Sequence, residues 1–209
     1  MPPPVPATRS FEAIALRTAE LLLAAFAAVL AIAASVWWAI EGDGNVHVLV
    51  PGVAIRSAEP SGAQLIALKQ RFGLRAVVNL RGRNDGEPWY EDEVRASRLL
   101  GLQHVDVALS AQRELTPSQI DAVLAVIEQA PKPVLIHCNA GSDRTGLISA
   151  AWLFAHGAPK DVADAQLALR YGHFPWLGSR TSAMDRSLEA FEWRRTHPMI
   201  APVLGETQG

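Results

Sequence analysis

Residues 134–146 constrain the fold of this chain more than any other part of the sequence. Residues 134–136 are apolar and predict a buried strand. The strand leads to Cys138, the only cysteine. Five residues separate Cys138 from Arg144, after which a helical pattern of apolar residues begins. A strand, a short loop and a helix in this order are typical of α/β domains, whose ligands bind beyond the carboxyl ends of the strands. We therefore expect Cys138 to lie at a ligand-binding edge.

The rest of the sequence also alternates between strand-like and helix-like segments. Apolar or alternating runs predict strands at residues 46–50, 53–55, 75–80, 104–109 and 134–137. Apolar spacing and turn residues predict helices at residues 62–72, 89–100, 117–130, 145–156, 161–171 and 182–195. We therefore predict a central, mostly parallel sheet of about four to five strands, flanked by helices.

Three of these helices begin with the residues of a capping box, in which two side chains satisfy backbone N–H groups at the helix start. The pairs are Ser61 with Gln64, Thr116 with Gln119, and Ser182 with Asp185. Gly73 and Gly157 follow two of the helices, and glycine is the commonest residue just after a helix end.

Residues 21–40 contain no charged residue and a single polar side chain, Ser35. A helix needs about 20 apolar residues to cross the ~30 Å hydrocarbon core of a bilayer. A helix buried in a soluble domain would show a polar face, which this run lacks. We therefore predict a transmembrane helix over residues 21–40. The alternative is a cleaved signal peptide, whose apolar region is normally shorter, at ~7–15 residues.

The charges on either side of this run predict its orientation. Arg9 and Arg17 precede the run, whereas Glu41 and Asp43 follow it, and the next basic residue is Arg56. By the positive-inside rule, this asymmetry favours a cytoplasmic N-terminus. The rest of the chain is then expected outside the cytoplasm, in the periplasm if the organism is a bacterium.

Composition excludes several other classes of function. The formal net charge is only −2, so nothing indicates a nucleic-acid partner. The six histidines show no close metal-type spacing and no second cysteine joins them, so we expect neither a metal nor a cofactor. A single cysteine also excludes an internal disulfide.

The loop after the strand has the chemistry needed to hydrolyse a phosphate monoester without a metal. A free cysteine is mostly protonated at neutral pH, and backbone N–H groups at a helix N-terminus stabilise its thiolate. The same N–H groups hold phosphate oxygens, and Arg144 is expected to grip two of them. The Thr145 hydroxyl is placed to donate a hydrogen bond to the sulfur as it leaves. The expected phosphate ligands are Asn139, Ala140, Gly141, Ser142, Asp143 and Arg144.

This loop resembles the phosphate-binding loop of the cysteine-dependent protein tyrosine and dual-specificity phosphatases, on the sequence HCNAGSDRTG of residues 137–146. Its part AGSDRTG is most similar to the bacterial dual-specificity branch, and residues 77–81 (VVNLR) are similar to a strand and loop found there. The resemblance covers residues 46–196. It implies a dual-specificity-phosphatase-like fold and a metal-free, two-step reaction through a cysteinyl-phosphate. It also implies that His137 braces the loop by hydrogen bonds.

The resemblance also implies a general acid, usually an aspartate on a loop that precedes the cysteine. The corresponding loop, residues 110–115, contains no aspartate and only Glu114. Asp106 lies 32 residues before Cys138 but inside a predicted strand, and Asp143 lies within the phosphate loop. Some members of the family carry an aspartate at the Asp143 position, where it has been given an acid role. We therefore hold Asp143 and Asp106 as nearly equal candidates, with Glu114 third.

The expected function is a membrane-anchored cysteine phosphatase that hydrolyses phosphate monoesters of the phosphotyrosine and dual-specificity type. Its substrates would be phosphorylated proteins or small or lipid phosphates, with Arg81 and Arg83 as candidate pocket walls. The aromatic segment 171–176 is a further candidate wall, although core packing explains it better. The phosphoinositide-directed branch usually has lysines in this loop, and their absence here disfavours that substrate.

Two alternatives remain open beside this function. One is a phosphatase-like module that binds phosphate but has lost catalysis, and the other is a phospholipid head-group phosphatase. Sulfur transfer on a rhodanese-like loop is a weaker third, because such a loop need not be followed by Asp-Arg-Thr-Gly.

These expectations divide the chain into five parts. They are an N-terminal tail (1–20), a transmembrane helix (21–40), a linker (41–45), a phosphatase domain (46–197) and a C-terminal tail (198–209). Every candidate site residue falls in the fourth part.

Overall fold

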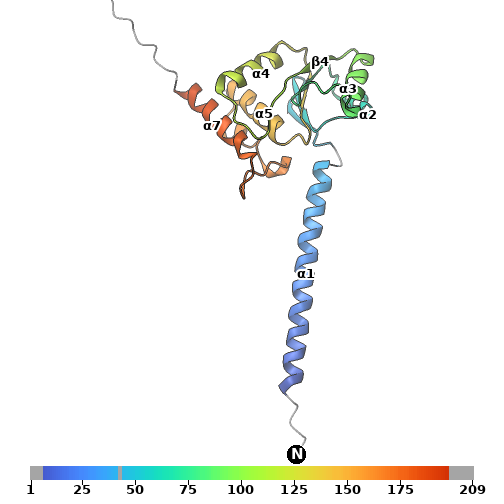
Figure 1. Ribbon diagram of the computed structural model, residues 1–209, viewed down its shortest axis with the longest axis vertical. Helices are drawn as coiled ribbons and strands as arrows, with labels where there is room; N and C mark the ends of the chain where they lie inside the picture. The colour runs from blue at the N-terminus through green and yellow to red at the C-terminus, as the bar shows by residue number, and fades with distance from the viewer. Residues whose placement is uncertain (1–6, 42–43, 198–209) are drawn as a thin grey trace, which may run out of the picture. The chain divides into compact units, whose positions relative to one another are not determined.

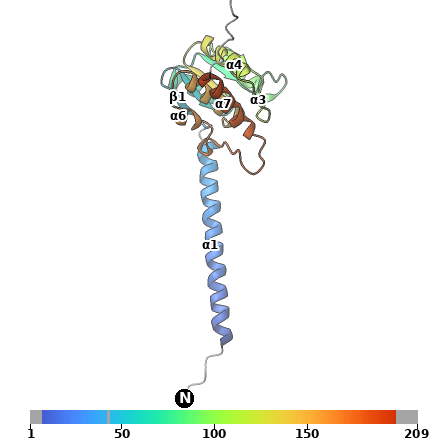
Figure 2. The same cartoon turned by 90° about the vertical axis from the view of Figure 1, so that its left-hand side faces the viewer.

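The computed structural model describes residues 7–41 and 44–197 of the chain (Figures 1 and 2). The chain separates into two units, Met1–Gly42 and Asp43–Gly209. The predicted C-terminal tail, and residues 42–43 of the predicted linker, lie outside the described residues.

The described part of the first unit is one continuous helix, α1 (Ala7–Glu41). Its segment Ala13–Ser35 has a mean hydropathy of 2.0 and no buried side chain. By length and composition α1 is able to cross a membrane, although signal sequences pass the same test. The helix extends N-terminal to the predicted start, into the predicted tail. Residues 7–20 contain four alanines, two glutamates and two arginines, which favour helix.

The second unit is built on a sheet of five strands in the order β1-β2-β5-β3-β4. The strands are β1 (His47–Val50), β2 (Ala54–Ser57), β3 (Ala76–Asn79), β4 (Gln103–Asp106) and β5 (Val134–His137). Only β1 runs antiparallel to its neighbour among the described strands; the other pairs are parallel. The predicted α/β fold with a mostly parallel sheet is therefore confirmed.

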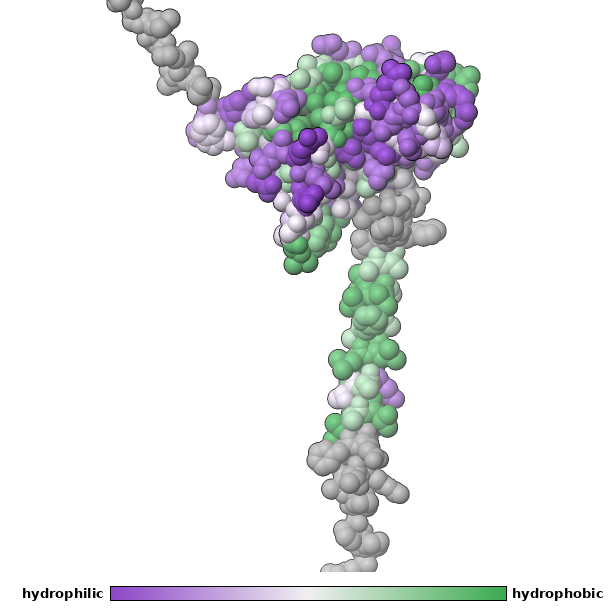
Figure 3. Space-filling model, viewed as in Figure 1, coloured by the Kyte–Doolittle hydropathy of each residue, from purple (hydrophilic) through white to green (hydrophobic). Residues whose placement is uncertain are grey.

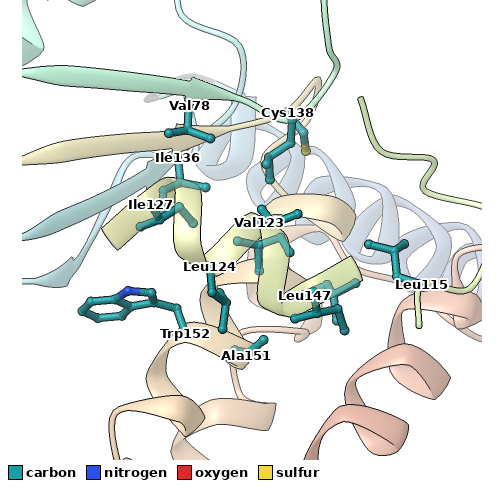
Figure 4. Packing of buried hydrophobic residues seen from close by; sticks show 14 of the residues in the cluster. Val78, Leu115, Val123, Leu124, Ile127, Ile136, Cys138, Leu147, Ala151 and Trp152 are labelled. Carbon is teal, nitrogen blue, oxygen red and sulfur yellow. The ribbon is translucent and has the colours of Figure 1, made fainter. Parts of the chain in front are cut away.

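Helices cover both faces of this sheet (Figure 1). On one face lie α2 (Gly62–Phe72) and α3 (Pro88–Leu99), and on the other lie α4 (Pro117–Gln129), α5 (Asp143–Ala155) and α7 (Ser182–Thr196). Successive residues of β5 alternate between the two cores, with Leu135 on the first face and Ile136 on the second. Figure 4 shows Cys138 at the edge of the second core, beyond Ile136 along the chain.

Two of the three predicted capping boxes are confirmed. Ser61 with Gln64 caps α2, and Thr116 with Gln119 caps α4. The third, at Ser182, does not form. Its partner Asp185 is hydrogen-bonded to His173, and the Ser182 hydroxyl donates to the Ser179 carbonyl instead.

The helix predicted over residues 161–171 was wrong as a single element. The structure has a short α6 (Lys160–Asp164) and a separate 3₁₀ turn, η1 (Leu169–Tyr171). Between them, the carbonyl and the side-chain oxygen of Gln166 both accept hydrogen bonds from Arg56. The Gln166 carbonyl also lies 2.9 Å from where a Cβ at Gly146 would be, so α5 approaches this backbone closely. These tertiary contacts override the local helical pattern.

The parallel register aligns the carboxyl ends of the strands at one edge. Ser57 of β2 and Asn79 of β3 both pair with His137 of β5, and Asn79 also pairs with Asp106 of β4. β4 ends at Asp106, earlier than the predicted strand, although the Val107 and Leu109 N–H groups still donate to Asn79 and Leu80. Cys138, one residue beyond β5, therefore lies at the predicted edge.

Candidate active site

Residues 138–142 form a tight loop between β5 and α5. The Cys138 side chain is buried, and the next helix begins at Asp143, so the loop leads directly to a helix N-terminus. Two backbone hydrogen bonds tie the loop to neighbouring segments, from the Glu59 N–H to the Asn139 carbonyl (3.0 Å) and from the Leu80 N–H to the His137 carbonyl (2.8 Å). The loop is thus held on both sides by segments that follow β2 and β3.

Gly141 is required by the shape of this loop. Its φ is +71°, a conformation that favours glycine. A Cβ at this position would lie 2.6 Å from the backbone atoms of Ser57 and Ala58. The loop therefore packs against the segment after β2 more closely than any side chain allows.

Arg144 and Thr145 carry buried polar atoms that lack a partner among the described residues. Arg144 Nη1 makes only long contacts, 3.5 Å to the Leu80 carbonyl and 3.4 Å to the Leu109 carbonyl, and its buried Nε makes none. The Thr145 hydroxyl is buried without a partner as well. Buried donors are costly unless they are satisfied. An oxyanion bound in the loop would satisfy the arginine, and the thiolate or a bound group would satisfy the hydroxyl.

Arg56 supports the loop from behind. It lies on β2, is fully buried, and donates from Nη2 to the Gly141 carbonyl at 2.7 Å. Its guanidinium also lies 3.9 Å from the centre of the Tyr171 ring. Burial lowers the pKa of Arg56 to about 10, although the acidic groups of Tyr171 and Cys138 oppose the change. Arg56 therefore remains a cation at neutral pH, and it fixes the conformation of the loop next to the thiol.

Asn45 forms a second support. Its side-chain N–H₂ group donates to the Ala140 carbonyl and to the Tyr171 carbonyl, both at 2.9 Å. Asn45 is buried and has a positive φ of 49°, which asparagine adopts more readily than most residues. Residue 45 was predicted to belong to a linker, but it is part of the wall of the loop.

His137 lies behind the loop in a buried network. Its Nε2 is 3.1 Å from Oε1 of Glu93 on α3, and the same oxygen is 2.6 Å from His104 Nε2 on β4. Burial raises the pKa of the Glu93 carboxyl, but hydrogen bonds from His104 and His137 outweigh burial and lower it to about 2. Glu93 is therefore ionised, and it joins α3 to the two strands that flank the site.

Asp106 ends β4 and is held by two donors. Asn79 Nδ2 donates to its Oδ1 at 2.9 Å, and the Tyr90 hydroxyl donates to its Oδ2 at 2.5 Å. Burial and this hydrogen bond raise the pKa of Tyr90, so its hydroxyl stays a donor. Asp106 thus accepts hydrogen bonds through both oxygens at the ligand-binding edge.

Asp143 is also engaged, by a buried histidine. Its Oδ1 lies 2.7 Å from His173 Nδ1, and His173 Nε2 lies 3.0 Å from Asp185 Oδ2. Burial lowers the pKa of His173, but the hydrogen bonds that its ring donates to the two aspartates outweigh burial and raise it. The third candidate acid, Glu114, forms an exposed ion pair with Arg186.

The two candidate pocket arginines have different surroundings. Arg81 forms an ion pair with Glu59 and stacks 3.7 Å from the centre of the Trp89 ring. Arg81 follows Leu80, whose carbonyl lies 3.5 Å from Arg144 Nη1, and burial and the positive charge of Arg144 lower the pKa of Arg81. Arg83 is exposed and pairs with Asp85. Among the described residues, no group of three or more metal-binding side chains is arranged to hold a metal ion.

Residues 44–200 match the family model of the Swiss Army Knife protein, DSP-PTPase phosphatase domain. This match covers well over half of the chain and includes the whole sheet and the loop after β5. The chain belongs to this family. The resemblance drawn from the loop sequence is therefore confirmed for the DSP-PTPase domain as a whole.

Two bacterial proteins are similar to the DSP-PTPase domain in sequence. A Cupriavidus necator protein assigned to the tyrosine-protein phosphatases is 29% identical over 140 residues, covering 53% of this chain and 50% of its own. The dual specificity protein phosphatase TpbA of Pseudomonas aeruginosa is 30% identical over 129 residues, covering 60% of this chain and 54% of its own. The chain thus spans about half the length of the curated relatives that it matches.

The fold of the DSP-PTPase domain is that of solved phosphatases. The crystal structure of P. aeruginosa TpbA matches it with a TM-score of 0.55 at 22% identity, over 75% of this chain and 94% of that chain. At this level of identity the likeness establishes the fold alone.

Sequence reasoning gave no site role to Asn45, Arg56 or Glu93, and it named His173 only as part of the candidate wall at residues 171–176. Arg56 directly follows the apolar residues 53–55 of a predicted strand. A charged residue adjoining a buried strand was the available signal. Glu93 and His173 gave no such signal, because their partners are distant in sequence.

Proposed function

We propose that this chain is a membrane-anchored cysteine phosphatase that hydrolyses phosphate monoesters through a cysteinyl-phosphate. One observation carries the proposal. Cys138 lies at the base of a loop in which the Arg144 Nε and the Thr145 hydroxyl are buried without partners among the described residues. These are the donors that a phosphate and a departing sulfur require.

The reaction then follows in two steps. The Cys138 sulfur attacks phosphorus and forms an S–P bond while the bond to the ester oxygen breaks, and a carboxylic acid gives that oxygen a proton. Water next attacks phosphorus and loses a proton to the same carboxylate, and the S–P bond breaks to restore the thiolate. Arg144 stabilises the planar transferring group in both steps.

For the substrate, we propose phosphotyrosine and related phosphorylated proteins. A variant of P. aeruginosa TpbA has been solved in complex with phosphotyrosine, and a similar fold surrounds Cys138 here. The loop offers no lysine for the additional phosphates of a phosphoinositide. Membrane anchoring rests on the apolar helix α1, and a phospholipid head group remains an alternative substrate.

A second candidate function is phosphate binding without catalysis. It is favoured by the carboxylates, since Asp106, Asp143 and Glu114 are all engaged by other side chains and the loop at residues 110–115 contains no aspartate. The presence of both Cys138 and Arg144 favours the enzyme.

The proposal is tested by hydrolysis of an aryl phosphate by the full chain, reduced and solubilised in detergent. We expect turnover that Cys138→Ser abolishes. A matched control is Ser149→Ala, which removes a buried hydroxyl from α5 at a position outside the motif of residues 138–145. Absence of turnover in a chain that is folded and reduced would contradict the enzyme and favour the binding module.

The general acid is identified by comparing Asp143→Asn, Asp106→Asn and Glu114→Gln. Loss of the acid is expected to lower kcat by about 10²–10⁴-fold for an alkyl phosphate, and by much less for a good leaving group such as nitrophenolate. A residue whose loss affects both substrates equally acts by positioning instead.

A further inference from the structure

The loop between η1 and α7 exposes a cluster of large apolar side chains. Phe174, Trp176 and Leu177 are 43%, 54% and 94% exposed. Figure 3 shows strongly hydrophobic colouring where this loop projects from the second unit, in the same view as Figure 1. Exposed apolar clusters of this kind mark contact surfaces in soluble domains.

The loop holds these side chains outward on a fixed base. At its start, the Tyr171 carbonyl accepts a hydrogen bond from Asn45, and the buried His173 binds both Asp143 and Asp185. The tip is closed by a hydrogen bond from the Ser179 N–H to the Trp176 carbonyl at 3.1 Å. The exposed aromatic residues therefore extend from a loop whose base is hydrogen-bonded to polar groups of the site.

Leu177 combines an unfavourable backbone conformation with an exposed apolar side chain. It has a positive φ of 56°, which is uncommon for a residue other than glycine or asparagine, and it is almost completely exposed. Neither the backbone nor burial within the described residues favours a leucine here. A contact outside the chain would supply the burial that its side chain lacks.

The charges around the cluster indicate the chemistry of that contact. Residues 170–181 contain two arginines, Arg170 and Arg180, both exposed, and no acidic residue. Exposed tryptophan, phenylalanine and leucine flanked by arginine are typical of segments that enter the interface of a bilayer with anionic lipids.

The described part of the second unit begins beside the base of this loop. Only Gly42 and Asp43 lie between the end of α1 and Gly44. A stretch of this length reaches at most ~10 Å, whatever its conformation. The residue after Gly44 is Asn45, which is hydrogen-bonded to Tyr171 at the base of the loop. If α1 spans a bilayer, this short connection limits how far the base of the loop can lie from the membrane surface.

We propose that residues 174–177 insert into the bilayer surface and orient the catalytic domain on it. The inference rests on the proposed anchoring by α1, but the insertion is a separate contact. Asn45 also binds the Ala140 carbonyl in the phosphate loop, so the site lies beside the tethered edge. Phosphate groups that project from the membrane surface, or from proteins close to it, would then be the accessible substrates.

The test uses the full chain in vesicles of phosphatidylcholine with phosphatidylglycerol. Cys138 is the only cysteine, so a Cys138→Ser chain carrying Leu177→Cys accepts an environment-sensitive nitrobenzoxadiazole label at one position. The control is Leu99→Cys on the same background, because Leu99 is also a highly exposed leucine of this unit, at 81%. Trp176→Cys supplies a second probe of the loop if the first variant folds poorly.

We expect the label at residue 177, but not that at residue 99, to shift to shorter emission wavelengths and to be quenched by spin-labelled lipid. The shift should be smaller in vesicles of phosphatidylcholine alone. An unshifted loop label on an anchored chain would overturn the inference. A second result would also overturn it: an emission shift that grows with the protein-to-lipid ratio while spin-labelled lipid leaves the fluorescence unquenched. That result would indicate a second copy of the chain as the partner.

Two further measurements separate this inference from the proposed function. A chain released from the vesicles by alkaline carbonate would overturn the anchoring, and the inference with it. Hydrolysis of a soluble aryl phosphate by Leu177→Asp, with Cys138 intact, reports on the enzyme alone and should equal that of the unmodified chain.

Discussion

At the scale of single residues, a fully buried cation holds the loop of the site. Arg56 donates to the Gly141 carbonyl and to two oxygens of Gln166. It therefore joins the phosphate loop to the segment between α6 and η1. A buried arginine with most of its donors satisfied fixes a geometry more firmly than a single neutral hydrogen bond would.

Replacing Arg56 with methionine should affect both stability and catalysis. The change leaves the Gly141 carbonyl and the Gln166 oxygens without their donor, and each unsatisfied group costs about 1–3 kcal/mol. We also expect a loss of kcat of at least about tenfold, because the loop is no longer fixed. Urea unfolding and steady-state kinetics measure the two effects.

Two controls bear on the role of Arg56. Arg98→Met, at an exposed position on α3, should change the free energy of unfolding by no more than ~0.5 kcal/mol. Arg56→Lys should restore part of the activity, since a lysine keeps the charge but satisfies fewer acceptors. Full activity in Arg56→Met would show that the loop does not need this support.

Glu93 predicts how stability depends on pH. Its pKa of about 2 in the folded chain lies below its ordinary value of 4.5. The stabilisation of the folded chain by ionised Glu93 is therefore fully present above pH 4.5, and it is lost as the pH falls from 4.5 toward 2. The difference corresponds to about 3 kcal/mol. As the pH falls through this range, the free energy of unfolding should decrease steeply for the unmodified chain and less steeply for Glu93→Gln. Parallel curves would contradict the assignment.

The main site residues could be predicted from sequence because they are close together in it. Cys138, Arg144 and the residues between them form one contiguous motif, and the structure places them in one loop and the first turn of the helix that follows it. The residues that support the loop, Arg56, Glu93 and His173, could not be predicted. Most of their hydrogen-bond partners lie 30 or more residues away along the chain. Such pairs form only when the sheet brings distant segments to one edge.

At the scale of elements, the backbone of the phosphate loop is the most constrained feature. Gly141 and Gly157 both have positive φ, at +71° and +83°. A Cβ at Gly141 meets the backbone of Ser57 and Ala58 at 2.6 Å, whereas a Cβ at Gly157 meets nothing within 4 Å. The two positions therefore share the strain of a left-handed backbone but differ in the space around them.

Alanine at these two glycines should separate strain from packing. Gly157→Ala is expected to cost about 1 kcal/mol of stability and to leave the kinetics unchanged. Gly141→Ala must displace the loop, so kcat for an aryl phosphate should fall by about 10²-fold or more. Equal kinetics in both variants would show that the loop tolerates the displacement.

Two helix starts that carry their own local signals were predicted correctly. The capping boxes at Ser61 and Thr116 are formed by neighbours in sequence, so their hydrogen bonds need no tertiary partner. The region from residue 161 to residue 185 was predicted less well. There the Gln166 oxygens and the Asp185 carboxylate are drawn into contacts with Arg56 and His173, and these contacts replace the helix and the cap that the local sequence favours.

At the scale of the whole molecule, the sequence predicts which side of a membrane the second unit occupies. Arg9 and Arg17 precede the uncharged run of residues 21–40, and Glu41 and Asp43 follow it. A reporter fused after Gly209 should therefore be active if it requires the extracytoplasmic side, and inactive if it folds only in the cytoplasm. The opposite pattern would place the site in the cytoplasm. Immunoblotting of the same fusion for its full length separates an anchor from a cleaved signal peptide.

The central claim is that Cys138 carries the phosphate during turnover. The most direct test is acid quenching of the full chain during hydrolysis of an aryl phosphate, followed by mass spectrometry of the peptide that contains Cys138. We expect phosphate on Cys138, in larger amounts in the variant that lacks the carboxylate acting as the base in the second step, and none in Cys138→Ser. Turnover with no phosphate on Cys138, or turnover that persists in Cys138→Ser, would contradict the account.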